Sequence, residues 1–280
     1  MRSARSLRQA ALVAAALAAC GGRPVPDEAT ARRVVSLTPS LTEVLYAMGA
    51  GDWVVGRTRW CDHPAAALAV PVVGDGIDFN VEAVAARQPD LVAYYPSASN
   101  RDAAARLGRL GIRTVALRTD SLDQVVRAAR VLGRLTGVPT EADSVADAFA
   151  AALDSARTAP RPPNPPRVLL LAWDQPPIVI GGGSFQSELV ALAGGRNVFD
   201  DLPQPSAHVT LETIAARDPD VVLVTGSETP DWARRPEWRV IPAVRERRFV
   251  VIEGTDFARP TFRALDAVRR LAAALAAVSP

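Results

Sequence analysis

Aromatic and arginine side chains follow several expected strands, at positions where they could contact a small molecule. Trp60 lies in the loop after a strand ending at Thr58, and Tyr95 ends the apolar strand that begins at Leu91. In α/β proteins, ligands bind in the crevice beyond the carboxyl ends of the strands. Aromatic rings supply contact area there, and an arginine supplies directed hydrogen bonds. The candidates for ligand contact are Trp60, Tyr95, Trp173, Phe257 and Arg259.

Few residues in the sequence are suited to catalysis or to metal binding. The two histidines, His63 and His208, have no obvious nucleophile partner, and no Gly-x-Ser-x-Gly motif of an α/β hydrolase is present. Two histidines cannot form a multi-histidine metal cage. A secreted hydrolase is therefore the disfavoured alternative, and we expect neither an enzyme nor a metal site. Cys61 is expected to be a partly buried thiol, and Gly181 to Ser184 fits either an anion-binding turn or a tight strand-to-helix turn.

An internal repeat indicates that the chain contains two lobes of similar construction. Residues 81–92 (VEAVAARQPDLV) recur 130 positions later as residues 211–222 (LETIAARDPDVV). In each copy a short amphipathic helix stops near a proline, and a Pro-Asp pair leads into an apolar strand. Asn80 and Thr210 occupy matching N-cap positions. The repeat predicts the same helix–strand unit in each lobe.

Strands and helices alternate around this repeat, which predicts an α/β fold with mostly parallel sheets. The expected lobes are residues 33–138 and 161–280. A long helix over residues 139–160, followed by a proline-rich stretch, should join the two lobes stiffly. Strands are expected at Val34–Thr38, Val54–Thr58, Leu91–Tyr95, Thr114–Leu117, Val168–Trp173, Ile178–Gly181, Val221–Thr225 and Phe249–Glu253.

The N-terminus has the pattern of a bacterial signal peptide, expected over residues 1–19. Three arginines precede an apolar run from Ala10 to Ala19 that is too short to span a bilayer. The run ends in Leu-Ala-Ala-Cys, which resembles a lipobox, so we expect a lipid on Cys20 and a tether over residues 20–32. Removing three arginines from a formal charge of +2 leaves −1, which provides no surface for nucleic acid. The sequence predicts a lipid-anchored protein of the periplasm or cell surface without an internal disulfide.

Three segments together resemble the helical-backbone (class III) periplasmic solute-binding proteins, which serve ABC importers of cobalamin, haem and ferric siderophores. These segments are residues 33–43 (RVVSLTPSLTE), residues 80–92 with their repeat copy, and residues 189–199, which contain GGRNVF. The resemblance runs from Arg33 to the C-terminus. Residues 60–64 (WCDHP) are most similar to the cobalamin-binding branch, which carries an aromatic residue followed by Asp-x-Pro at this point.

The resemblance implies a monomer that binds cobalamin or another corrinoid between its lobes and has no covalent cofactor. Trp60 and Tyr95 match aromatic ligand contacts of the cobalamin branch. Asp256 with Arg259 resembles the polar pair of that branch, although the two residues are three apart here rather than four. Aromatic faces and a few polar donors would suit the flat ring and its amide fringe.

Two departures from the cobalamin branch leave other chelates open. Gly76 and Ser206 stand where that branch has tryptophans, so a ferric siderophore or haem is the alternative ligand. Haem would need an axial ligand, for which the sequence offers Tyr94, Tyr95 or His208.

The resemblance also implies a partner, the permease dimer of an ABC importer. Glu82 and Glu212 occupy the positions at which family members engage arginines on the two membrane subunits. A carboxylate on the first turn of a helix also interacts favourably with the helix dipole, so the two roles are compatible.

Overall fold

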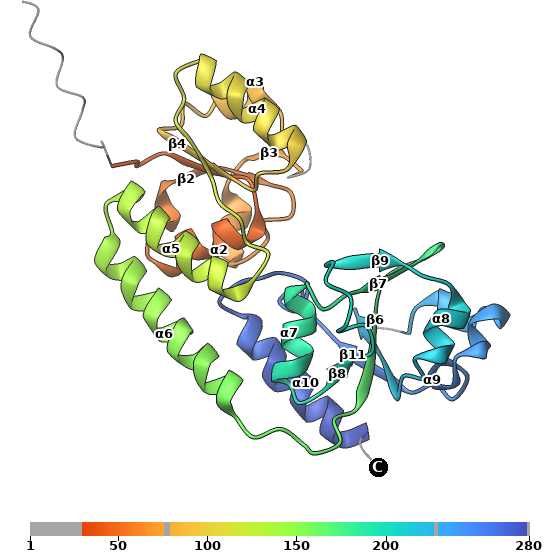
Figure 1. Cartoon of the computed structure of the whole chain (residues 1–280). Coiled ribbons are helices and arrows are strands. Elements are labelled where there is room, and N and C mark those ends of the chain that lie inside the picture. Colours follow the sequence, from red (N-terminus) through yellow and green to blue (C-terminus); the bar gives the residue numbers. More distant parts are fainter. Residues whose placement is uncertain (1–29, 76–78, 227–228, 279–280) are drawn as a thin grey trace, which may run out of the picture. The chain divides into compact units, whose positions relative to one another are not determined.

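Two β-sheets, each formed by one half of the sequence, organise the described part of the chain (Figure 1). The computed structural model describes residues 30–75, 79–226 and 229–278. Both sheets belong to a single unit, Ala31–Pro280. The predicted signal peptide, Cys20 and Gly76 lie outside the described residues.

The N-terminal sheet is parallel throughout, and helices cover both of its faces. Its strands, in spatial order, are β3 (Val72–Gly74), β2 (Val54–Thr58), β1 (Val34–Ser36), β4 (Leu91–Tyr94) and β5 (Thr114–Ala116). Its helices are α2 (Pro39–Ala47), α3 (Val81–Ala85), α4 (Ala98–Arg109) and α5 (Leu122–Thr136), with 3-10 turns η1 (Gly51–Trp53) and η2 (Ala65–Ala69). Val34 packs toward α2 and α5, whereas Val35 packs toward α3 and α4. This burial on both faces explains the continuous apolar runs of the strands.

The first strand is shorter than predicted because the chain turns into a helix at once. β1 ends at Ser36, and Thr38 becomes the N-cap of α2, where its side chain accepts a hydrogen bond from the backbone N–H of Leu41. Pro39 at the first helical position fixes the turn. The turn brings residues 37–39 to the carboxyl edge of the sheet.

The C-terminal sheet is mixed rather than purely parallel. Its order is β11 (Phe249–Ile252), β10 (Val221–Thr225), β6 (Arg167–Asp174), β7 (Pro177–Ile180) and β9 (Ser206–His208), and β8 (Arg196–Asn197) also pairs with β6. β11, β10 and β6 are parallel, whereas the β6–β7–β9 pairs are antiparallel. The helices of this lobe are α7 (Phe185–Leu192), α8 (Leu211–Ala216), α9 (Pro242–Arg245) and α10 (Ala264–Val278), with 3-10 turns η3 (Asp231–Arg234) and η4 (Pro236–Val240).

A long helix, α6 (Pro139–Thr158), leads from the first lobe to the second, as predicted. Gly137, with a φ of 72°, ends α5 in the left-handed conformation, and Pro139 starts α6 two residues later. Figure 1 shows α6 beside α5 before the chain enters the second sheet, and the core residues Phe149 and Leu153 anchor it. Within the described ranges, no helix has the length and apolarity needed to cross a membrane.

The repeated Pro-Asp pair has the same structural role in both lobes. The Asp90 carboxylate accepts a hydrogen bond of 2.9 Å from the backbone N–H of Arg33, just before β1. The Asp220 carboxylate accepts one of 2.7 Å from the backbone N–H of Arg167, at the start of β6. In each copy the aspartate therefore fixes the start of the neighbouring central strand.

Candidate functional site

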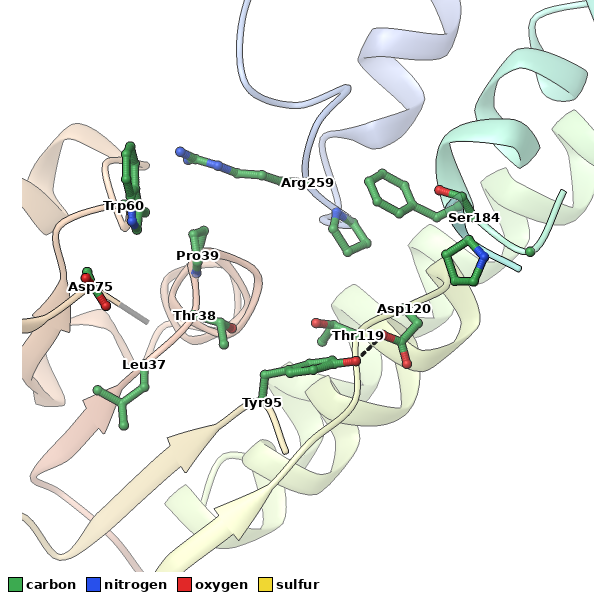
Figure 2. A pocket seen from close by; sticks show the side chains of 14 residues that line it. Leu37, Thr38, Pro39, Trp60, Asp75, Tyr95, Thr119, Asp120, Ser184 and Arg259 are labelled. Carbon is green, nitrogen blue, oxygen red and sulfur yellow. Dashed lines mark hydrogen bonds between the residues drawn. The ribbon is translucent and has the colours of Figure 1, made fainter. Parts of the chain in front are cut away.

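A cleft of about 550 Å³ lies between the two sheets and is lined by both lobes (Figure 2). Its first wall consists of the segments that follow the five parallel strands, because their carboxyl ends meet at one edge of the sheet. Its second wall comes from the start of α7, the segment before β9 and the segment after β11. The lining residues are Leu37, Thr38, Pro39, Trp60, Asp75, Tyr95, Thr119, Asp120, Gly183, Ser184, Phe185, Pro205, Arg259 and Pro260.

Aromatic side chains from both lobes line the cleft. Trp60 and Tyr95, two of the predicted ligand contacts, line one wall, and Phe185 lies on the opposite wall. Trp60 is 53 % exposed, so about half of its surface is available to a bound molecule. Phe185 is not among the contacts predicted from the sequence, although its place after a strand and a glycine run is a signal that could have found it. The arrangement offers apolar contact area on both sides of one space.

Arg259 joins the two lobes at the edge of the cleft. Its guanidinium pairs with both carboxylate oxygens of Asp62, with an Nη2–Oδ2 distance of 3.1 Å, and its side chain is only 13 % exposed. The hydrogen bonds from Arg259 hold the pKa of Asp62 below its ordinary value. Among the described lining residues Arg259 is the one cation, and its charge is therefore already compensated.

The other predicted contact residues lie outside the cleft lining. The Asp256 carboxylate accepts hydrogen bonds of 2.8 Å from Arg270 on α10 and is buried, so the two members of the expected polar pair, Asp256 and Arg259, lie in separate ion pairs. Phe257 is fully buried in the core. Trp173 is 60 % exposed, and its indole N–H donates to the carbonyl of Gln175. Of the predicted ligand contacts, the structure brings together Trp60, Tyr95 and Arg259.

Two carboxylates that the sequence did not single out also line the cleft. The Tyr95 hydroxyl donates a hydrogen bond of 2.6 Å to Asp120, which follows β5 (Figure 2). This bond and, second to it, burial raise the pKa of Tyr95. Asp75 follows β3 and pairs with Arg59 at 3.4 Å. The position of Asp120 beyond a strand end is the same signal that identified Trp60 and Tyr95.

Two further sets of ion pairs connect the lobes around the cleft. Arg263, just before α10, donates to both oxygens of Glu43 on α2 at 2.8 and 2.7 Å, and the Glu43 side chain is only 6 % exposed. Arg157 near the end of α6 pairs with Asp123 on α5 and with Glu188 on α7. These pairs connect elements of the first lobe and of α6 with elements of the second lobe.

The glycine run before α7 is explained by close packing. A Cβ atom on Gly182 would lie 2.1 Å from the carbonyl oxygen of Asp200, and one on Gly183 would lie 2.1 Å from that of Pro203. Ser184 is the N-cap of α7. The tight-turn alternative therefore accounts for the motif. Cys61 is fully buried, with its sulfur 3.1 Å from the hydroxyl of Thr58.

The two repeat helices present their glutamates away from the cleft. Asn80 and Thr210 cap α3 and α8 as predicted, each accepting a hydrogen bond from the backbone N–H three residues on. The Glu82 side chain is 76 % exposed and lies 3.3 Å from Arg106. Glu212 is also exposed, and hydrogen bonds from its own backbone N–H and from Thr210 lower its pKa. Neither glutamate lines the cleft.

Comparison with known sequences finds one family model, described as periplasmic binding protein, that matches residues 34–254. The vitamin B12-binding protein of Vibrio cholerae serotype O1 is 28 % identical over 250 residues, which cover 89 % of each chain. The vitamin B12-binding protein of Yersinia pestis is 31 % identical over 199 residues, or 71 % of each chain.

Solved structures with the same fold include carriers of two kinds of ligand. The periplasmic vitamin B12 binding protein BtuF of Vibrio cholerae matches with a TM-score of 0.73 and 27 % identity, covering 89 % of this chain and 98 % of that one. The periplasmic heme-binding protein RhuT from Roseiflexus sp. RS-1 matches with a TM-score of 0.74 and 26 % identity, covering 88 % and 98 %.

Proposed function

Because the chain belongs to the periplasmic binding protein family, whose members carry small-molecule ligands to ABC transporters, we propose that it binds a corrinoid such as cobalamin between its lobes. Proteins of this family carry their ligands without converting them, so the chain is a carrier and not an enzyme. The proposed ligand contacts are Trp60, Tyr95 and Arg259, together with Phe185 from the second lobe.

The composition of the cleft is the main support for a corrinoid. Aromatic rings from both lobes border one space of about 550 Å³, which suits a flat macrocycle with apolar faces. Apart from Arg259, the polar side chains of the lining are hydroxyls and carboxylates, including Thr38, Thr119 and Asp120. Such groups can accept hydrogen bonds from the amide fringe of a corrinoid. The relatives named for vitamin B12 agree with this choice.

Haem or a ferric siderophore is the second candidate, favoured by the similarity to a heme-binding carrier. Two of the three side chains considered for axial ligation are poorly placed for it. Tyr94 is buried against Phe79 in the core, and His208 lies on β9 outside the cleft lining. Tyr95 is the remaining candidate. An anionic chelate would also meet a cleft whose arginine is already paired with Asp62.

We further propose that Glu82 and Glu212 dock the two halves of an ABC permease, and that a lipid on Cys20 holds the protein at a membrane facing the periplasm or the cell surface. The exposure of both glutamates on equivalent helices supports the docking role. The apolar run that ends at Cys20 supports the anchor.

The decisive experiment is a titration of the purified protein with cobalamin, ferric haem and a ferric catecholate, followed by visible absorbance and calorimetry. We expect saturable one-to-one binding of cobalamin that is tighter than binding of either iron chelate. Tighter binding of haem or of the catecholate would favour the second candidate, a carrier of haem or of a ferric siderophore. Failure of all three to bind would refute the assignment to this group of ligands.

A further inference from the structure

The carboxylate of Asp120 is fixed beside the hydroxyl of Tyr95 in the wall of the cleft (Figure 2). One of its oxygens accepts the Tyr95 proton over 2.6 Å, and the other accepts a hydrogen bond of 2.6 Å from Arg118 Nε. The backbone N–H of Asp120 donates to Gln124 Oε1, also over 2.6 Å. Two hydrogen bonds to the carboxylate and one from the backbone therefore fix the position of Asp120.

The pairing follows from the register of two neighbouring strands. Tyr95 directly follows β4 and Asp120 follows β5, and these strands are paired in parallel with Tyr94 opposite Ala116. The next residue, Ser121, caps α5 and so fixes the backbone at Asp120. The phenol and the carboxylate meet because the sheet and the helix place them together.

This hydrogen bond disfavours binding of the Tyr95 oxygen to a haem iron. Among the described residues that line the cleft, Tyr95 has the one phenol, and none has an imidazole or a thiol. Where a tyrosine holds haem iron, the oxygen bound to iron has given up its proton. Loss of the proton from Tyr95 would leave two anions within hydrogen-bonding distance of each other, which is unfavourable. The hydrogen bond to Asp120 accordingly raises the pKa of Tyr95.

The same carboxylate determines which polar groups can approach the wall. Each carboxylate oxygen can accept more than one hydrogen bond, so Asp120 can accept from the N–H groups of an amide. A ligand carboxylate would be repelled there, and Arg259, the cation of the described lining, already pairs with Asp62. The other charged groups nearby are Arg118, 64 % exposed, and Asp75, which pairs with Arg59.

We propose that the Tyr95–Asp120 hydrogen bond sets the ligand class of the cleft by withholding the phenolate oxygen from ferric haem and presenting carboxylate lone pairs to ligand amides. Asp120 is thus a positioning residue toward Tyr95 and a direct contact toward an amide-fringed ligand. The second role rests on the proposed corrinoid function, whereas the first does not.

The test compares ferric haem binding to the wild-type protein and to the Asp120→Asn variant by visible absorbance. Asparagine keeps the shape of the side chain and can still accept the hydrogen bond, but it removes the negative charge. We expect haem affinity to rise by about tenfold or more, because the negative charge that opposes a neighbouring phenolate is removed. The variant should also show the absorbance of phenolate-ligated ferric haem, and its cobalamin affinity should fall. Adding Tyr95→Phe to this variant should abolish the new absorbance.

Asp75→Asn is the matched control, because it removes the same charge from the same cleft without changing the partner of the phenol. It should leave the haem spectrum unchanged. Equal gains in haem affinity for both aspartate variants, or phenolate-ligated haem in the wild-type protein, would overturn the proposal. A wild-type protein that binds no cobalamin would refute the proposed function and the amide role of Asp120. The haem comparison would still decide the role of the hydrogen bond.

Discussion

Trp60→Ala is expected to weaken corrinoid binding substantially without unfolding the protein. A tryptophan side chain presents about 200 Å² of surface for burial. Trp60 is 53 % exposed, so a ligand can cover roughly half of that, about 100 Å². At about 25 cal/mol per Å², covering it contributes about 2.5 kcal/mol to binding. The dissociation constant should therefore rise by about 70-fold.

The measurement is calorimetric titration of cobalamin into wild-type and variant proteins, with thermal melting to check the fold. Trp173→Ala is the matched control, because Trp173 is 60 % exposed but lies outside the cleft lining. Its affinity should equal that of the wild type. If Trp60→Ala binds with unchanged affinity, the placement of the ligand beside Trp60 is wrong. If Trp173→Ala loses as much affinity as Trp60→Ala, the ligand also contacts Trp173, which the sequence predicted as a contact but which lies outside the cleft lining.

Three other changes test the remaining proposals. Reversing both Glu82 and Glu212 to Arg should leave ligand affinity and melting temperature nearly intact, because both side chains are exposed. Uptake by the cognate permease should be abolished, since the two introduced arginines would face arginines of the permease. Transport at the wild-type rate would contradict docking. Cys20→Ser should shift the protein from the detergent phase to the aqueous phase or leave unprocessed precursor, and identical partitioning would exclude the anchor. Hydrogen bonds from Arg157 lower the pKa of Asp123. These bonds therefore contribute fully to the free energy of unfolding at a pH above the carboxyl pKa of the unfolded chain, about 3.9. The contribution is lost as the pH falls below that value. Asp123→Asn should therefore make the acid-induced fall in melting temperature less steep, and an unchanged slope would count against this pair.

The features predicted correctly from sequence depend on residues close together in the chain. A cap acts on the backbone N–H three residues on, so Asn80 and Thr210 could be read directly as helix starts. The helix expected over residues 139–160 likewise begins at Pro139, as α6. Two lobes joined by a long helix followed from these local signals.

Pairings across the cleft could not be predicted in the same way. Arg259 and Asp62 are 197 positions apart, and their contact depends on how two sheets face each other. Asp256 lies only three residues before Arg259, yet it pairs with Arg270 on a helix that packs against the sheet. An irregular segment can direct adjacent side chains to different elements, so the sequence did not reveal that Asp256 and Arg259 have separate partners. Residues beyond strand ends were identifiable, but their partners were not.

The two repeat copies share the features that support the fold and differ at the end of the repeated strand. They share the capped helix, the exposed glutamate and the Pro-Asp pair, which in both lobes fixes the start of a central strand. At the carboxyl end of the repeated strand they diverge, since Tyr95 in the first copy corresponds to Thr225 in the second. A permease with two similar halves would require the same charge on both lobes, whereas a macrocycle with unlike edges would require two different walls. The shared glutamates and the different strand ends fit such a pair of partners.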